Sequence, residues 1–109
     1  MEISKADWKL FRERIADWQE AYMDRLNQEY ISLLSDSDKG ASDKFWELEE
    51  RIRRDKNTPG VQLNLRKAEV VWDLTALLND HVIQMTDLDG FSDELVETVK
   101  RLAGINSID

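Results

Sequence analysis

Hydrophobic side chains recur at three- and four-residue spacing over the first third of the chain. The stripe comprises Trp8, Phe11, Ile15, Trp18 and Tyr22, and after a shift of one residue Leu26, Tyr30, Leu33 and Leu34. This is the spacing of one helical face, and neither Pro nor Gly interrupts it. Ser4, with Asp7 three residues later, resembles a capping box and marks the start. The pattern predicts a helix over residues 5–35, about 45 Å long and too long for one short partner to cover.

The next two apolar stripes predict a helical hairpin. After a loop rich in Ser and Asp, hydrophobic residues at helical spacing predict a second helix over residues 42–56. Thr58 is a candidate N-cap with Pro59 at the first helical position, which predicts a third helix over residues 58–78. The two helices would turn at Pro59-Gly60.

The remaining sequence predicts a helical turn over residues 86–90 and one short helix. Ser92 is a candidate N-cap of that helix, and Gly104 lies where a helix stop is expected. The whole pattern predicts an all-α fold: a small helical bundle with a long N-terminal helix, a central helical hairpin and a short C-terminal helix. Residues 1–104 would form one domain and residues 105–109 a tail. The residues expected in the core are Phe11, Ile15, Trp18, Tyr22, Phe45, Leu48, Ile52, Leu65, Trp72, Leu78 and Leu95.

The composition is that of a folded, acidic protein. Of 109 residues, 41% are hydrophobic, and the net charge is −8. Cysteine is absent, which excludes disulfides, thiolate nucleophiles and Cys-based metal sites. No stretch approaches the ~18 apolar residues that a membrane helix needs, and the negative charge disfavours direct contact with nucleic acid. We therefore expect a cytoplasmic protein that binds neither membranes nor nucleic acid.

Charge is divided unevenly along the second half of the chain. Residues 51–67 form a basic stretch in which Asp55 is the only acidic residue. Its cations are Arg51, Arg53, Arg54, Lys56, Arg66 and Lys67. This group could bind phosphates or an acidic partner, or it could be a solvated helix face. Residues 68–99 hold eight acids and no Lys or Arg.

The acidic stretch supplies most of the candidate partner-binding residues. They are Asp73, Asp80, Asp87, Asp89, Asp93, Glu94 and Glu97, together with Trp8, which we expect at an overhanging end of the first helix. If these acids share a face, they would imitate a phosphate backbone and occupy a basic groove on another protein. Ordinary surface acidity accounts for the same pattern.

Motifs for metal or catalytic chemistry are weak. Residues 36–47 match a calcium loop at four positions, but Gly40 replaces a ligand and Ala41 replaces the glycine of the sharp turn. His81 is the only histidine, and no Glu-x-x-His spacing precedes it; a place at a helix end is its simplest interpretation. No Gly-x-Ser-x-Gly turn or Gly-rich phosphate loop occurs. We expect no cofactor, no metal site and no enzymatic activity.

Two stretches carry a resemblance to known proteins. They are residues 3–26, which begin Ile-Ser-Lys-Ala-Asp-Trp-Lys-Leu-Phe-Arg, and residues 72–95, from Trp-Asp-Leu to Phe-Ser-Asp-Glu-Leu. They resemble short acidic proteins of Gram-positive bacteria and their mobile elements, a setting that includes anti-CRISPR inhibitors. Such inhibitors bind a Cas effector and block guide or target-DNA engagement. The resemblance implies a small inhibitory or regulatory binding protein, and it assigns no functional residues.

These observations lead to one expected function and one alternative. The expected function is a non-enzymatic protein-binding module that inhibits a nucleic-acid-handling effector, of anti-CRISPR type, through an acidic surface that contacts a basic partner. The alternative is a structural helical protein that self-associates through its long first helix as a homodimer.

Overall fold

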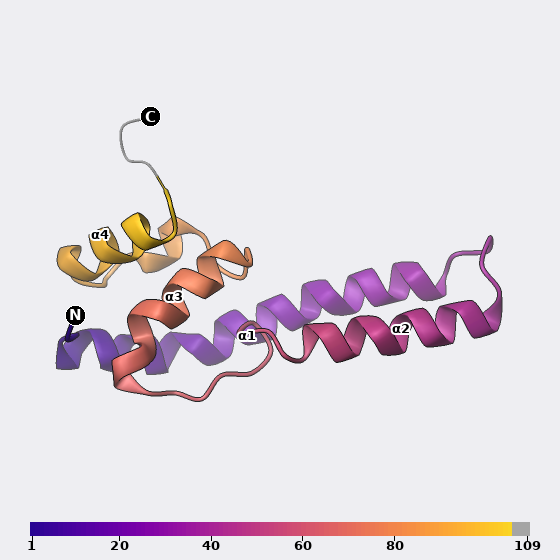
Figure 1. Cartoon of the computed structure of the whole chain (residues 1–109), viewed down its shortest axis with the longest axis horizontal. Coiled ribbons are helices and arrows are strands. Elements are labelled where there is room, and N and C mark those ends of the chain that lie inside the picture. Colours follow the sequence, from indigo (N-terminus) through magenta and orange to yellow (C-terminus); the bar gives the residue numbers. More distant parts are fainter. Residues whose placement is uncertain (106–109) are drawn as a thin grey trace.

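The computed structural model describes residues 1–105, and within that range its regular elements are all helices (Figure 1). The four α-helices are α1 (Lys5–Leu34), α2 (Ala41–Asp55), α3 (Val70–Asn79) and α4 (Asp93–Leu102). The short 3-10 helices η1 (Lys67–Glu69) and η2 (Met85–Leu88) precede α3 and α4. The predicted all-α fold and long N-terminal helix are confirmed. The predicted tail, residues 105–109, lies outside the described residues except for Ile105.

Helix ends coincide with several of the predicted signals. The hydroxyl of Ser4 accepts a hydrogen bond from the backbone N–H of Asp7 at 3.0 Å, and that of Ser92 accepts one from Leu95 at 3.3 Å. His81 follows the end of α3 with a φ of 59°. The N–H of the next residue, Val82, donates to the carbonyl of Leu77 at 2.9 Å, which is the closing bond of a Schellman motif. His81 therefore ends a helix, in a conformation that usually requires Gly.

The third helix begins at Val70, so the prediction that it starts at Thr58 and Pro59 was wrong. The Thr58 hydroxyl donates to the carbonyl of Asp55 at 2.7 Å instead of capping a new helix. Gly60 is buried against Tyr22 of α1, and residues 62–66 run on without helical structure. Packing of this turn against α1 thus prevails over the local helix signal.

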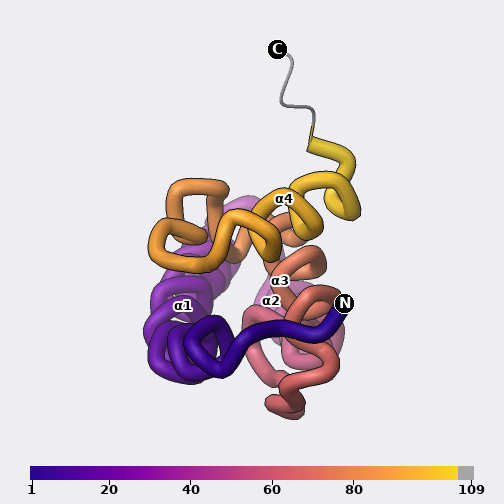
Figure 2. Tube along the Cα trace, turned by 90° about the vertical axis from the view of Figure 1, so that its left-hand side faces the viewer, coloured from indigo at the N-terminus to yellow at the C-terminus, as the bar shows by residue number. Residues whose placement is uncertain are grey.

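Helix α1 runs the length of the molecule and belongs to two parts of it. Its first half shares a hydrophobic cluster with α3 and α4, whereas its second half pairs with the antiparallel α2 (Figure 1). We call residues 23–56 the arm and the remaining described residues the body. Viewed along the long axis, α4 lies above α1 and α3 (Figure 2). The radius of gyration, 16.8 Å, exceeds the roughly 13 Å of a compact domain this size, because the arm projects.

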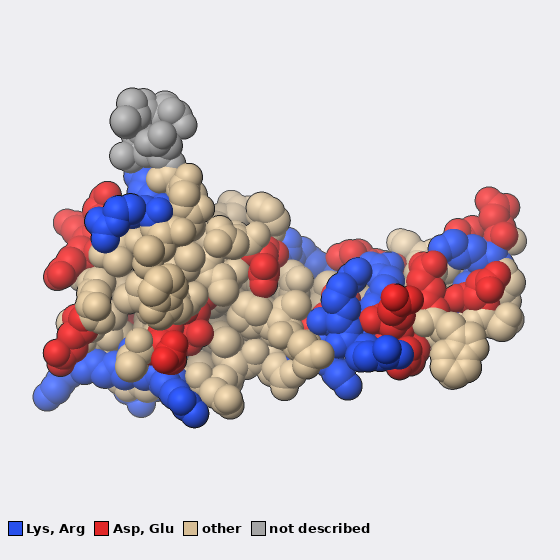
Figure 3. Space-filling model, in the orientation of Figure 1, with Lys and Arg blue, Asp and Glu red and all other residues tan. Residues whose placement is uncertain are grey.

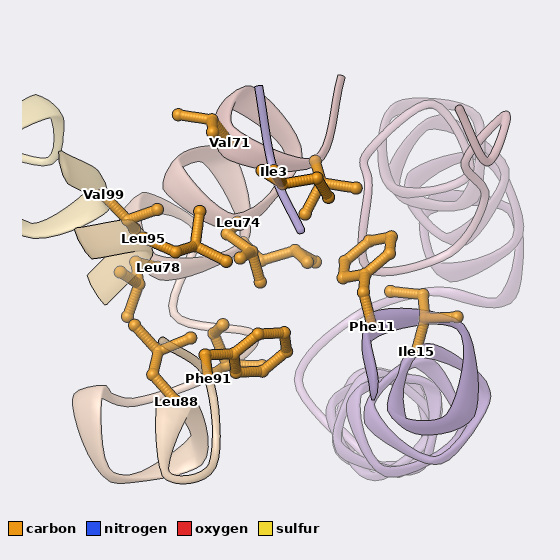
Figure 4. Packing of buried hydrophobic residues seen from close by; sticks show 13 residues of the cluster. Ile3, Phe11, Ile15, Val71, Leu74, Leu78, Leu88, Phe91, Leu95 and Val99 are labelled. Carbon is orange, nitrogen blue, oxygen red and sulfur yellow. The ribbon is translucent and has the colours of Figure 1, made fainter. Parts of the chain in front are cut away.

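The main hydrophobic cluster lies in the body (Figure 4), and Leu26 and Leu33 are buried in the arm. The fully buried side chains of the cluster are Phe11, Val70, Leu74, Leu77, Leu95 and Val99. Four predicted core residues are confirmed as buried: Phe11, Ile15, Leu78 and Leu95. Trp18, Tyr22 and Leu48 are half-buried. Ile3, which sequence reasoning missed, occupies the position before the Ser4 cap and packs in the same cluster as Trp8, as in a hydrophobic staple.

Four predicted core residues are exposed instead. The exposed fractions are 61% for Phe45, 43% for Ile52, 43% for Leu65 and 59% for Trp72. The prediction assumed that a helix over residues 58–78 would cover α2. Since α3 begins later and packs with α4, it does not cover Phe45 and Ile52 of α2, and Trp72 lies on the outer face of α3.

Candidate protein-binding surface

Helix α2 turns a largely polar face toward α1. Lys44 donates to the carbonyl of Leu34 at 3.1 Å, and Arg51 pairs with Glu29 at 2.8 Å. Lys44, Arg51 and Asp55 are spaced at i, i+7 and i+11, which places them on one helical face. Leu48, at i+4, shares this face and is half-buried. Phe45 and Ile52 lie on a neighbouring face and are exposed.

A tyrosine–aspartate hydrogen bond fixes this rotation of α2. The hydroxyl of Tyr30 donates to a carboxylate oxygen of Asp55 at 2.5 Å, and Asp55 is only 6% exposed. Burial and this hydrogen bond raise the pKa of Tyr30 to about 12, so the hydroxyl keeps its proton at neutral pH. The Arg54 guanidinium donates to the second carboxylate oxygen at 3.2 Å. The contact between Tyr30 and Asp55 therefore holds Phe45 and Ile52 of α2 outward.

Two hollows lie along the stripe and share Ile52 and Lys56. The larger, of about 420 Å³, is lined by Phe45, Leu48, Glu49, Ile52, Arg53 and Lys56. The smaller, of about 270 Å³, is lined by Met23, Leu26, Asn27, Tyr30, Ile52, Asp55, Lys56 and Val61. We call the two together the arm groove. From Phe45 to Lys56 helix α2 rises about 16 Å, or three turns.

Exposed aromatic side chains lie at one end of this groove. Trp46 is 64% exposed, and its ring meets that of Phe45 edge to face with centroids 5.0 Å apart. At 150–250 Å² per aromatic side chain, these two residues alone present roughly 250 Å². Ile31 and Leu34, toward the tip of the arm, are also exposed. Patches of a few hundred Å² on a monomer often mark interaction sites.

The predicted basic group is divided between two places. Arg51, Arg53 and Arg54 belong to α2 and Lys56 is its C-cap, and of these Arg53 and Lys56 line the arm groove. The first three pair with Glu29, Glu49 and Asp55 respectively. Arg66 and Lys67 precede α3, and Lys67 lines a separate hollow with Met1 to Ile3. The exposed cations near the middle of the molecule are interleaved with acids (Figure 3).

The predicted acidic residues are grouped only in part. Asp93, Glu94 and Glu97 are exposed on the first half of α4, and Asp89 lies just before it. The Asp87 carboxylate accepts a hydrogen bond from the backbone of Gln84 at 2.7 Å and so closes a capping box. Asp73 and Asp80 belong to α3 and its end.

Cations approach the acidic group from two elements. Arg14 of α1 donates to the carbonyl of Asp87 at 3.0 Å and to that of Asp89. Lys100 and Arg101 occupy the last turn of α4. Residues 68–99 contain no Lys or Arg, but cations from other parts of the chain lie near their surface.

Trp8 does not overhang, so that part of the prediction was wrong. It is half-buried against the core, its ring stacks on Phe11 at 6.4 Å, and Arg12 lies over it at 4.9 Å. The projecting end of α1 is the opposite one, in the arm. The staple position of Trp8 explains why the N-terminal turn is covered.

Sequence reasoning missed a buried contact between the two helix caps. Asp7 is 3% exposed, and its carboxylate accepts hydrogen bonds from the Ser92 backbone N–H at 2.9 Å and the Ser92 hydroxyl at 2.6 Å. The carboxylate thus lies between the N-terminal ends of α1 and α4, where helix dipoles favour negative charge. The predicted capping box is incomplete, because Asp7 reaches Ser92 instead of the backbone of Ser4.

Asp73 carries the most perturbed carboxyl among the predicted partner-binding residues. One of its oxygens is buried without a hydrogen-bond partner in the described part of the chain. Burial, and to a lesser extent the nearby charge of Glu69, raises the pKa of Asp73 from its ordinary 3.8 to about 6. At neutral pH the charged form is therefore held at a cost in stability.

We expect Asp73→Asn to stabilise the protein at neutral pH by about 1 kcal/mol, a value reduced because the carboxyl is partly solvated. With a raised pKa the folded state binds more protons between about pH 4 and 6, so wild-type stability falls as the pH rises through that window. When urea unfolding is measured across this pH range, the free energy of unfolding should fall less steeply with rising pH in the variant than in the wild type. Equal slopes for the variant, the wild type and the exposed-site control Asp24→Asn would contradict the assignment.

Residues 36–47, which partly match a calcium loop, form a turn and the start of α2. Asp36 accepts a hydrogen bond from the backbone of Asp38 at 2.9 Å, and Lys39 pairs with Glu47 at 2.8 Å. Within residues 1–105, no group of three or more His, Cys, Asp or Glu side chains is placed to hold a metal ion.

Comparison of the chain with protein families, with curated proteins and with solved structures found no match. The resemblance of residues 3–26 and 72–95 to acidic proteins of mobile elements therefore stays a prediction. Over the described residues, no helix combines the length and apolar character needed to cross a membrane.

Proposed function

We propose that this chain is a protein-binding module whose binding surface is the arm groove. One observation carries the proposal: Phe45 and Ile52 of the apolar stripe of α2 are exposed, although Phe45, Leu48 and Ile52 have the spacing of a buried helical face. The Tyr30–Asp55 hydrogen bond holds the stripe in that outward position.

The shape of the groove suits a helix as the bound element. About three turns of α2 line the groove, and at its smaller hollow the second half of α1 forms the opposite wall. An amphipathic helix that inserts apolar side chains at i, i+3 and i+7 is a recurring occupant of such grooves. Exposed aromatic residues such as Phe45, which lines the groove, and its neighbour Trp46 commonly contribute much of the binding energy.

Capture experiments with matched variants test this proposal. Wild-type protein and the variants Phe45→Asp and Trp72→Asp would be immobilised and exposed to an extract of the native host. Both residues are exposed, at 61% and 59%, so both variants should fold, and only Phe45 lies in the arm. We expect capture to be lost with Phe45→Asp and kept with Trp72→Asp. Identical sets of proteins captured by all three would refute the arm groove as the binding surface.

A second candidate surface is the exposed acidic face of α4. Asp93, Glu94 and Glu97 share the first half of that helix and could occupy a basic groove of a nucleic-acid-handling effector. Contacts of this kind speed association and weaken as salt rises. The triple variant Asp93→Asn, Glu94→Gln, Glu97→Gln should then bind a captured partner more slowly and with a smaller salt dependence. Unchanged kinetics would exclude this face.

A further inference from the structure

We infer that the occupant of the arm groove is a second copy of this chain, bound antiparallel about a two-fold axis. The inference rests on the proposed function, since it names the partner of the same groove. It draws on three features of the arm: the distribution of charge along α2, the match between a projecting side chain and a hollow, and the apolar area.

Charge along α2 is self-complementary. Residues 41–50 hold four acids and one lysine, and residues 51–56 hold four cations and one acid. An antiparallel two-fold arrangement places the acidic half of each α2 against the basic half of the other. Surfaces that meet in this isologous way must complement themselves, and opposite charges select the register. A helix of uniform charge from another protein would match only one half.

The groove contains both a projecting group and a hollow to receive it. Phe45 projects from one end of α2, and the smaller hollow lies two to three turns away, where Ile52, Asp55 and Lys56 line it. A two-fold axis between these points carries Phe45 of one copy toward the hollow of the other. The hollow measures about 270 Å³, and an apolar cavity of about 150 Å³ is enough to hold benzene.

The apolar area is compatible with a weak to moderate dimer. Phe45, Trp46, Ile52, Ile31 and Leu34 are each 43–64% exposed on the arm. Together they present roughly 500 Å², against about 800 Å² of total surface per partner in a standard interface. Two paired arms would form a four-helix arrangement, which gives the helix hairpin the layered core that two helices alone do not provide.

Sedimentation equilibrium over a wide concentration range tests the inference. We expect the mass of the wild type to rise from 12.8 kDa toward twice that value. Phe45→Asp should stay monomeric, while the matched control Trp72→Asp should dimerise like the wild type. A wild type that remains monomeric at the highest concentration would overturn the second copy as occupant, as would equal dimerisation of the two variants.

Charge exchange gives a second, independent test. Glu49 and Lys56 both line the groove, on opposite halves of α2. Glu49→Lys and Lys56→Glu should each weaken self-association by about tenfold or more, because like charges then face each other. An equimolar mixture should regain dimers, since each variant offers the charge that the other lacks. A mixture no more dimeric than its components would count against the antiparallel arrangement. If self-association is not found, but Phe45→Asp still abolishes the capture of a different protein, the second copy is refuted as the occupant and the arm groove remains the proposed binding surface.

Discussion

Asp7→Ala is expected to lower the free energy of unfolding by about 3 kcal/mol. The carboxylate is buried and accepts two hydrogen bonds from Ser92, one from the N–H that opens α4. Its removal leaves that N–H and the hydroxyl without their acceptor and deprives two helix N-termini of a nearby negative charge. The contact joins residues 85 positions apart in the chain, so its loss should loosen α4 from α1.

Urea and thermal unfolding measure this effect directly. For a domain of this size, a 3 kcal/mol loss corresponds to a fall in Tm of roughly 10–20 °C. Asp17→Ala, at an exposed position of the same helix, is the matched control and should change stability by less than about 0.5 kcal/mol. If the two variants were equally stable, the Asp7–Ser92 contact would not be what holds α4 in place.

Gly60→Ala should destabilise the protein by about 2–3 kcal/mol through overpacking. A Cβ atom at this buried position would lie 2.6 Å from the Tyr22 Cε2 atom and 2.7 Å from the Val82 Cγ2 atom. The turn is also tied to α1 by Gln19, whose side-chain amide donates to the Pro59 carbonyl at 3.0 Å. The backbone therefore cannot move away easily, and the joint between arm and body would be strained.

The matched control for this prediction is Gly40→Ala. There the nearest atom to an added Cβ is the Asp43 Oδ2 atom, 3.8 Å away, so the only expected cost is the weaker capping of α2, below about 1 kcal/mol. Chemical denaturation of both variants gives the comparison. A Gly60→Ala protein as stable as Gly40→Ala would mean that the turn is not tightly packed.

Local signals in the sequence were enough for much of the fold. The uninterrupted stripe predicted α1 to within a residue at either end, and Ser4 and Ser92 cap the helices they were expected to cap. These features depend on neighbouring residues only. The start of α3 could not be predicted in the same way, because the Thr58 and Pro59 signal was outweighed by packing of Gly60 against Tyr22.

The candidate site was missed for the same reason. Phe45 and Ile52 have the pattern of core residues, and a pattern cannot tell which element covers a stripe. A third helix that begins eleven residues earlier, at Pro59 instead of Val70, would have covered α2. The Asp7–Ser92 contact also depends on tertiary arrangement, since nothing in the local sequence distinguishes a first-turn aspartate that binds another helix from one that completes its own cap.

Hydrogen exchange measured at low and high protein concentration tests the central claim most directly. The claim is that the stripe of Phe45, Leu48 and Ile52 is an interface in solution. Pairing of two arms should slow amide exchange in α2 and the second half of α1 as concentration rises, while α3 and α4 keep their rates. Exchange in α2 that is independent of concentration, or a change confined to the body, would contradict the claim.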